Sequence, residues 1–426
     1  MSSGVTLVAA GRDNPLNIDP DFTFFSTVYK RHTNFSSVID RLNINTKPSN
    51  NGSSTSRFEI KGDLLSYVYL VCESPDEFTT SRDWSQVIDK VELFIGNQLV
   101  DTQYYEYSKK IVPDVQASSL SRSVKGSDGS TSSYFYPFKF FFCEDWASTI
   151  PLIALNYHDV EVVIHWADDV YRQLEVQAYL NLFANYWNTF SNVQENVVRI
   201  INATALVNAY SNLITGISNP KAVPTYDENT GFITFDGETD IIGSNVGSTA
   251  LYTYAENYGR TILGYSFDLF TRYIYIDKDE RRITADRSVD YVITQTQRIP
   301  ASNKKEIELP LSHPVSFIAS TASNFNDTNN MLLEINSEPI GESKPAIPHY
   351  RHVSTYFHSP YGSNQNTTMM YPFCLDASKK DPTGTLNFSR LDSARLILDQ
   401  AINGDIYAVN YNILRISNGV GGLLYA

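Results

Sequence analysis

The stretch "VEVVIHW", Val160–Trp166, shows the pattern that decides the fold. Val160, Val162, Ile164 and Trp166 fall on one face of an extended chain, and the residues between them fall on the other. Alternation with a period of two is typical of a β-strand with one face against a core. We therefore predict a strand here.

A second run, "VELFIGNQLV", begins at Val91 and shows the same alternation. Val91, Leu93 and Ile95 share one face, and Gly96-Asn97 then offers a tight turn before the next apolar residue. This run predicts a β-hairpin.

The run "DIYAVNYNILRIS", 405–417, is apolar on both faces, which predicts a central strand. Polar, turn-rich segments separate such runs. They are 43–56, 114–133, 217–249, 320–330 and 358–368. Many short strands with long connections are typical of sandwiches and barrels and not of alternating β–α units. The predicted class is all-β with a few short helices.

The composition favours two β-rich domains. A chain of 426 residues is long for a single core, and its 28 Tyr and 23 Phe suit strands. Weak internal matches occur in the same order at offsets of 240, 235 and 254 residues, and this order predicts a duplicated β domain. The matches are "IGNQLV" with "INSEPI", "YPF" with "YPF", and "ALNYHDVEV" with "AVNYNILRI", beginning at 95 and 335, 136 and 371, and 154 and 408.

The formal net charge of −14 argues against direct binding of nucleic acid, because that affinity depends on lysines and arginines that displace counterions. Cys72, Cys143 and Cys374 lie far apart, and we expect buried thiols and no zinc site. No apolar run is long enough to span a bilayer, and the first ten residues do not resemble a secretory signal. We expect a protein that is made and kept in the cytosol.

An aromatic segment with a basic end, "FTFFSTVYKRHTNF", occupies Phe22–Phe35. Asp19-Pro20 before it is a good N-cap and first-turn pair, so we predict a short amphipathic helix, with a strand as the competing interpretation. Its apolar i, i+4 pairs are Phe24 with Val28 and Phe25 with Tyr29, and its terminal cations are Lys30, Arg31 and His32.

The sequence favours no catalytic or metal chemistry. It contains no HExxH, GxSxG or phosphate-binding glycine motif, so we predict no catalytic residue, metal or cofactor. His349 and His352 stand in a loop-like context that does not favour a ligand pair. The acidic pairs Glu144-Asp145 and Asp168-Asp169 leave a glycosidase open only in principle. The run "DKDERR", 277–282, is interpreted as a surface turn with local ion pairs.

Residues 272–305 carry eight cations and five anions in an otherwise acidic chain. The cations of this segment, together with Lys30 and Arg31, could give one end of the molecule a positively charged base. The alternative is a surface of mixed charge.

A resemblance to a known family emerges when the motifs are taken in order. "LVAAGRDNPLNIDPDFTFFSTVYKRHTNF" from Leu7 closely resembles the N-terminal signature of the major capsid proteins of nucleocytoplasmic large DNA viruses. Further similar segments follow in the family's order to the C-terminus. They are "GDLLSYVYL", "VELFIGNQLVDTQYYEY", "IPLIALNYHDVEV", "RYIYIDKDERR", "LSHPV", "DPTGTLNFSRLDSARL" and "YAVNYNILRISNGVGGLLY".

The resemblance implies two tandem eight-stranded antiparallel jelly rolls, the double jelly roll of these virion proteins. It implies a structural capsid subunit without enzymatic activity. Three copies would form a homotrimer, a pseudo-hexagonal capsomer that tiles an icosahedral shell assembled in the host cytoplasm. Its partners would be itself, neighbouring capsomers, minor capsid proteins and the inner viral membrane.

One departure from the family affects the expected domains. About 115 residues separate Tyr157 from Tyr273, where the family has a short connection, so we expect an insertion at about 168–263. Within it, 217–249 is polar enough for an exposed loop. The expected domains are an N-terminal arm (1–22), a first jelly roll with this insertion (23–280) and a second jelly roll (281–426).

Two alternatives remain beside the major capsid protein. One is a minor double jelly-roll capsid paralogue at special positions of the shell. The other, from a different class, is a jelly-roll carbohydrate-binding or glycosidase protein, which would need exposed Trp platforms. As assembly and inner-face residues we predict the following: Phe24, Phe25, Val28, Tyr29, Lys30, Arg31, His32, Arg281 and Arg282.

Overall fold

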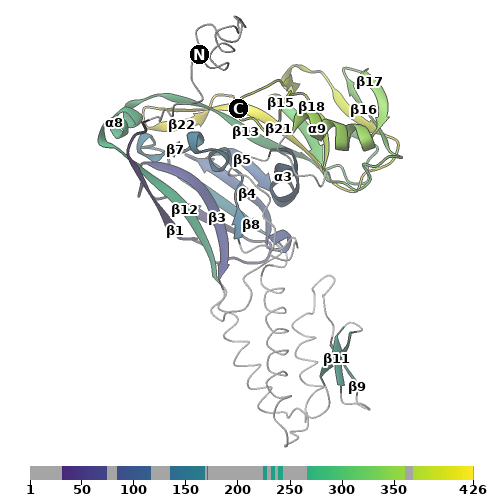
Figure 1. Ribbon diagram of the computed structural model, residues 1–426, viewed down its shortest axis with the longest axis horizontal. Coiled ribbons are helices and arrows are strands. Elements are labelled where there is room, and N and C mark those ends of the chain that lie inside the picture. The colour runs from purple at the N-terminus through teal and green to yellow at the C-terminus, as the bar shows by residue number, and fades with distance from the viewer. Residues whose placement is uncertain are drawn as a thin grey trace, which may run out of the picture. The chain divides into compact units, whose positions relative to one another are not determined.

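The computed structural model describes most of the chain outside its first thirty residues (Figure 1). The described residues are 31–73, 84–116, 135–167, 170, 224–227, 232–235, 238–242, 266–359 and 368–425. The chain divides into two compact units, 1–35 and 36–426. Both pairs of sheets described below belong to the second unit, apart from Phe35 at the start of the first strand.

The first pair of sheets is built from residues 35–276. One sheet has the strand order β1 (Phe35–Leu42), β12 (Ser266–Ile276), β3 (Leu64–Glu73) and β6 (Phe135–Pro137), with β7 (Ile150–Pro151) beside β3. The other has the order β2 (Ser53–Arg57), β8 (Val160–Trp166), β4 (Ile88–Ile95) and β5 (Gln98–Tyr104). In β8 the side chains of Val160, Val162, Ile164 and Trp166 are buried and those between them are half-buried, as predicted from "VEVVIHW".

The second pair is built from residues 289–423. One sheet has the order β13 (Val289–Ile299), β21 (Ile406–Ser417), β15 (Pro314–Ser320) and β18 (Met369–Pro372), with β19 (Leu386–Asn387) and β22 (Val420–Leu423) at its sides. The other has the order β14 (Glu306–Glu308), β20 (Ala394–Leu398), β16 (Asn330–Ile335) and β17 (Glu338–Pro345). β21 lies between two strands, as its two apolar faces predicted.

The two pairs have the same topology. If the eight principal strands of each pair are numbered along the chain, one sheet has the order first, eighth, third, sixth, and the other has the order second, seventh, fourth, fifth. This antiparallel arrangement of two packed sheets is a jelly roll. The predicted double jelly roll is therefore confirmed.

Two of the three internal matches fall at equivalent positions of the two jelly rolls. "IGNQLV" and "INSEPI" both form the turn between the fourth and fifth strands, with positive φ at Gly96, Asn97, Asn336 and Ser337. The two "YPF" motifs belong to the sixth strands. The third match is not equivalent, because "ALNYHDVEV" leads into a seventh strand and "AVNYNILRI" lies in an eighth.

The described helices are short. They are η1 (Trp84–Gln86), η2 (Tyr107–Ile111), α3 (Val112–Val115), α4 (Phe141–Glu144), η3 (Trp146–Ser148), η4 (Leu152–Ala154), α8 (Lys278–Asp286), η5 (Ala346–Val353), α9 (Ser354–His358) and η6 (Phe388–Arg390). In the part of the chain that the structure describes, none of them has the length and apolar character needed to cross a membrane.

Two predictions about local structure are wrong. The run 277–282 is not a turn, because Asp277 takes the extended N-cap conformation and α8 follows with Asp279 and Glu280 in its first turn, where the helix dipole favours anions. The segment 217–249 is not only loop, because β9 (Pro224–Asp227), β10 (Phe232–Phe235) and β11 (Glu238–Ile242) form a three-stranded sheet. The run "FITF" in this segment, made only of residues that favour strands, was the strand signal that its polar composition hid.

Each jelly roll has its own apolar core between its two sheets. The first core also takes in Ile293, Leu414 and Ile416 from strands of the second jelly roll. The predicted boundary between 280 and 281 stays a prediction, since the compact unit 36–426 contains both pairs of sheets.

Candidate assembly interface

The predicted N-terminal site lies largely outside the described residues. Phe24, Phe25, Val28, Tyr29 and Lys30 are outside them. The adjacent Arg31 and His32 are exposed, and the His32 ring bonds through Nδ1 to the carbonyl oxygen of Thr33 at 2.9 Å. The proposed inner-face role of this segment stays a prediction.

Arg281 and Arg282 lie on α8, where both are exposed. Arg281 forms an ion pair across 3.0 Å with Asp63, whose side chain is buried and also accepts a hydrogen bond from the backbone N–H of Ile276. We had predicted local ion pairs for this run. The ion pair of Arg281 instead connects α8 with the segment before β3.

Two cations of the segment 272–305, Arg272 and Arg298, lie in different surroundings from each other. Arg272 lies over the rings of Tyr67 and Trp146, at 5.7 and 5.2 Å from their centroids. Arg298 instead pairs with Asp405, with 2.6 Å between Nε and the carboxylate, and lies over the ring of Tyr104. These contacts favour the mixed-surface alternative for these two arginines.

The two jelly rolls meet along the fifth strand of the first, β5, and the first strand of the second, β13. The backbone N–H of Thr296 donates to Oδ1 of Asp101 across 2.9 Å, and the Gln295 amide donates to the carbonyl oxygen of Val100. Asp101 is buried, and burial raises the pKa of its carboxyl to about 7. Gln103 also donates to this carboxyl, at 3.1 Å.

The hairpin turn before β5 is covered by β22, near the C-terminus. Leu423 donates its backbone N–H to Oε1 of Gln98 at 3.0 Å, and the His158 ring bonds through Nδ1 to the carbonyl oxygen of Gly421 at 2.8 Å. A Cβ at Gly421 would stand only 2.9 Å from Leu155 and 3.0 Å from Ile95. The close approach of the two jelly rolls therefore favours glycine here, since any side chain would displace Leu155 and Ile95.

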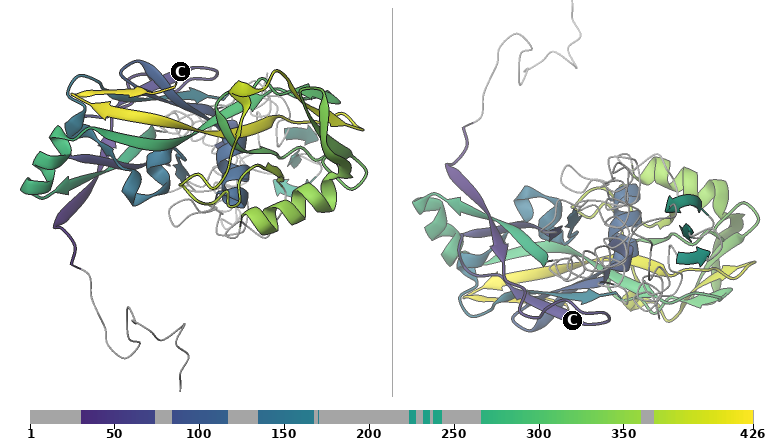
Figure 2. Two further views of the ribbon diagram at one scale, coloured as in Figure 1. Left: turned by 90° about the horizontal axis from the view of Figure 1, so that it is seen from above. Right: turned by 90° about the horizontal axis from the view of Figure 1, so that it is seen from below.

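The helical segment after β5, η2–α3 (107–115), packs on the outer face of the β13-β21-β15-β18 sheet. Its Tyr107, Ile111, Val112 and Val115 are buried there in a third apolar cluster. The sheet contributes Phe317, Ala319, Met370, Tyr407 and Val409 to this cluster. We call these five residues the covered face. Figure 2 shows α3 where the two pairs of sheets meet.

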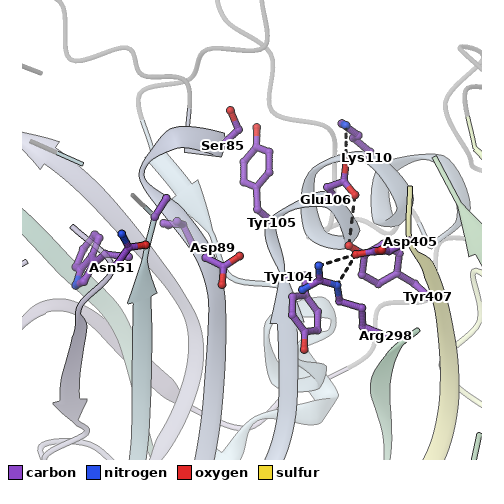
Figure 3. A pocket seen from close by; sticks show the side chains of 13 residues that line it. Asn51, Ser85, Asp89, Tyr104, Tyr105, Glu106, Lys110, Arg298, Asp405 and Tyr407 are labelled. Carbon is purple, nitrogen blue, oxygen red and sulfur yellow. Dashed lines mark hydrogen bonds and ion pairs between the residues drawn. The ribbon is translucent and has the colours of Figure 1, made fainter. Parts of the chain in front are cut away.

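A cavity of about 690 Å³ opens beside this junction (Figure 3). Charged groups on its wall pair with one another: Arg298 with Asp405, and Lys110 with Glu106 across 3.0 Å. Among the described residues, no group of His, Cys, Asp and Glu forms a candidate metal site. Asp168-Asp169 lies outside the described residues, so its glycosidase interpretation stays untested.

The outer face of the corresponding sheet in the first jelly roll is aromatic and partly exposed. Tyr69 stacks on Phe270 with ring centroids 5.5 Å apart, and Trp146 is 44% exposed. The residues of this aromatic face are Tyr67, Tyr69, Phe135, Trp146, Phe270 and Arg272. We did not predict this face, but "LLSYVYLVC" contains the signal, since large residues occupy both alternating sets of positions.

The helical segment after β17, η5–α9 (346–358), carries exposed apolar side chains. Tyr356 is 77% exposed, Phe357 is 68% exposed, and Val353 is also exposed. The preceding strand β17 is exposed along nearly its whole length. Exposed apolar side chains grouped in this way on one helical segment commonly mark an interaction site.

Two family models match the chain. The model described as "Major capsid protein N-terminus" matches residues 23–209, and the one described as "Large eukaryotic DNA virus major capsid protein" matches residues 319–422. Together they span more than half of the chain.

The relatives are similar over nearly their whole length. A major capsid protein of Pyramimonas orientalis virus is 25% identical, covering 99% of this chain and 98% of the relative. "Probable capsid protein 4" of Acanthamoeba polyphaga mimivirus is 24% identical, covering 100% and 99%. A chain in the structure of the PBCV-1 virus capsid is similar in fold, with a TM-score of 0.62 and 19% identity, covering 95% of this chain and 100% of that one.

Strand order, junction and exposed apolar surfaces define a double jelly-roll capsid protein. With the family models matched at both ends, the chain belongs to the family of large eukaryotic DNA virus major capsid proteins. It is a structural subunit of the virion capsid, and the family implies a non-enzymatic role.

Proposed function

We propose that this chain builds the shell as a homotrimer, in which three copies contribute six jelly rolls to a pseudo-hexagonal capsomer of an icosahedral capsid. One observation carries the proposal: two jelly rolls of identical strand order pack side by side in one chain. Three such pairs supply six similar units, which suits closed cyclic symmetry. The net charge of −14 helps to keep free capsomers soluble.

The mass of the native protein in solution tests the trimer. The chain mass is 48.0 kDa, so light scattering should give about three times that value, near 144 kDa. A strict monomer at high protein concentration would contradict the proposal.

The partners of the capsomer would be neighbouring capsomers, minor capsid proteins and the inner viral membrane, with assembly in the host cytoplasm and no catalysis. We assign Phe24, Phe25, Val28 and Tyr29 to anchoring the N-terminal arm. We assign Lys30, Arg31, His32, Arg281 and Arg282 to the inner side of the shell. The chain divides into the units 1–35 and 36–426, and this division supports an arm of this kind.

Deletion of Met1–Phe35 tests the arm. The truncated protein should keep its β structure by circular dichroism and still trimerise, but form shells poorly with its partners. Normal shell assembly by the truncated protein would reduce the segment to ordinary packing.

A minor capsid paralogue is the second candidate, because one relative of matching length is named a numbered capsid protein and not a major one. The copy number of this chain in purified virions distinguishes the two. A dominant shell protein supports the major role, and a small, fixed number of copies supports the minor role.

A further inference from the structure

The contact between the two jelly rolls of one chain provides a template for contacts between chains. In this contact, the fifth strand of one jelly roll, β5, lies against the first strand of the next, β13. The helical segment that follows the fifth strand, η2–α3, then covers the outer face of the next jelly roll's first-eighth-third-sixth sheet. The template thus consists of a strand and helix on one side and an edge strand and sheet face on the other.

The second jelly roll carries the first half of this template. Among the described residues, its contact with the first jelly roll lies at the end of this segment, where α9 meets α3 and the Ser359 hydroxyl donates to the carbonyl oxygens of Asp114 and Val115. Its fifth strand is β17, which is exposed, and the helical segment that follows is η5–α9. In η2–α3 the apolar side chains are buried, whereas in η5–α9 Tyr356 and Phe357 have most of their surface exposed.

The first jelly roll carries the second half of the template, the edge strand and the sheet face. Its first strand, β1, is exposed over most of its length, and Val38 and Ile39 are about half exposed on opposite faces. The aromatic face lies on the third, sixth and eighth strands of the first jelly roll, as the covered face does in the second. Tyr69 lies opposite Phe270 on the third and eighth strands, as Phe317 lies opposite Val409 in the second jelly roll.

The chemistry of the aromatic face is that of a binding surface. Tyrosine, tryptophan and arginine are the residues that most often dominate binding energy at protein interfaces. An antiparallel sheet that faced only water would instead carry polar residues on this side.

We propose that β17 and η5–α9 of one copy dock on β1 and the aromatic face of a second copy, repeating between chains the contact that joins the two jelly rolls within a chain. This inference rests on the proposed homotrimer. The contact is head-to-tail, since the two surfaces are different, and it closes into a ring when three copies supply six equivalent steps. The aromatic face and η5–α9 are therefore both buried in the capsomer.

Charge insertion on the exposed helix tests the contact. The double variant Tyr356→Asp, Phe357→Asp should keep the wild-type circular dichroism and melting temperature as a monomer, because both side chains are exposed, but should weaken trimer formation at least 100-fold. Ile283→Asp is the matched control, since Ile283 is similarly exposed on a different helix, α8, and it should leave the trimer intact.

Crosslinking gives a second, independent measurement. Cys72, Cys143 and Cys374 are all buried, so cysteines introduced at Phe357 and Tyr69 would be the reactive thiols. A short bis-maleimide should join Phe357→Cys, Tyr69→Cys chains into a ladder that stops at three, and neither single variant should crosslink.

The outcomes separate this inference from the proposed function. A monomeric wild type would overturn both. A trimeric wild type whose Asp double variant also remains trimeric, or whose cysteine pair does not crosslink, would overturn the docking surface alone.

Discussion

The same sheet face has different chemistry in the two jelly rolls. In the second jelly roll the covered face combines Ala319, Met370 and Val409 with the aromatic Phe317 and Tyr407, and all five are buried. In the first jelly roll the aromatic face keeps Trp146 and Phe135 partly exposed. Strand order is identical, so topology does not cause the difference. A face that is covered during folding can be apolar throughout, whereas a face that waits for another chain must also tolerate water, and tyrosine, tryptophan and arginine do both.

Alanine substitution at the centre of each face should give the largest difference in stability between the two faces. Phe317→Ala should lower the free energy of unfolding by about 3–5 kcal/mol, because it opens a cavity between the sheet and η2–α3. Tyr69→Ala should cost the isolated chain about 1 kcal/mol, since its ring is only partly buried before assembly. Chemical denaturation of both variants measures this, and equal losses would contradict the distinction between the two faces.

The titration of Asp101 is the next largest expected difference between the internal junction and the equivalent position of the second jelly roll. Asp101 stands three residues after Gln98, and in the aligned "INSEPIGES" run Gly341 takes this place in β17, so only the internal junction buries a carboxyl here. Its pKa is raised to about 7 from 3.8, so the folded state favours the protonated acid. Stability from this group is therefore fully present below about pH 4, is lost as the pH rises toward 7, and stays constant above that.

Asp101→Asn removes the titration while it keeps an acceptor for the Thr296 N–H. The wild type should lose about 2–4 kcal/mol relative to this variant between pH 4 and 7, as measured by denaturant unfolding across that range. If the two pH profiles run parallel, Asp101 is already ionised in the folded protein at low pH.

Gly421 offers a smaller test of how tightly the internal junction is packed. Gly421→Ala should cost about 1–3 kcal/mol, because the new methyl group meets Leu155 and Ile95 at about 3 Å. Gly422→Ala is the control, since its Cβ would approach only the flexible end of Gln98, at 3.3 Å. Differential scanning calorimetry should give a clearly lower Tm for Gly421→Ala, and similar melting of both variants would mean that the junction yields.

Most of the fold could be predicted from local patterns. "VEVVIHW" and "VELFIGNQLV" alternate so regularly that strand, face and turn follow from period two and the Gly96-Asn97 pair. The match of "IGNQLV" with "INSEPI" identified equivalent positions of the two jelly rolls, because both runs form a turn that needs positive φ. The match of "ALNYHDVEV" with "AVNYNILRI" did not, because the residues they share are merely common in strands.

The site was much harder to predict. The aromatic face comes from β3, β6, β12 and η3, which are distant in sequence, and no single run shows that their side chains share a surface. The run 277–282 misled us because its mixed charges indicated local pairs, whereas the partner of Arg281 is more than two hundred residues earlier. Charge patterns along a chain do not identify partners that tertiary structure brings together.

The ion pair of Arg281 gives the smallest expected effect and separates a structural role from an inner-face role. Arg281→Met should lower the free energy of unfolding by about 1 kcal/mol, because it leaves the buried carboxylate of Asp63 with the Ile276 N–H as its described partner. Arg282→Met on the same helix should leave stability unchanged, since Arg282 is exposed. Urea titration measures both, and shell assembly is then compared at equal stability. If Arg282→Met impairs assembly and Arg281→Met does so only through its lower stability, the inner-face assignment belongs to Arg282 alone, and equal assembly by both variants and the wild type would remove it from α8.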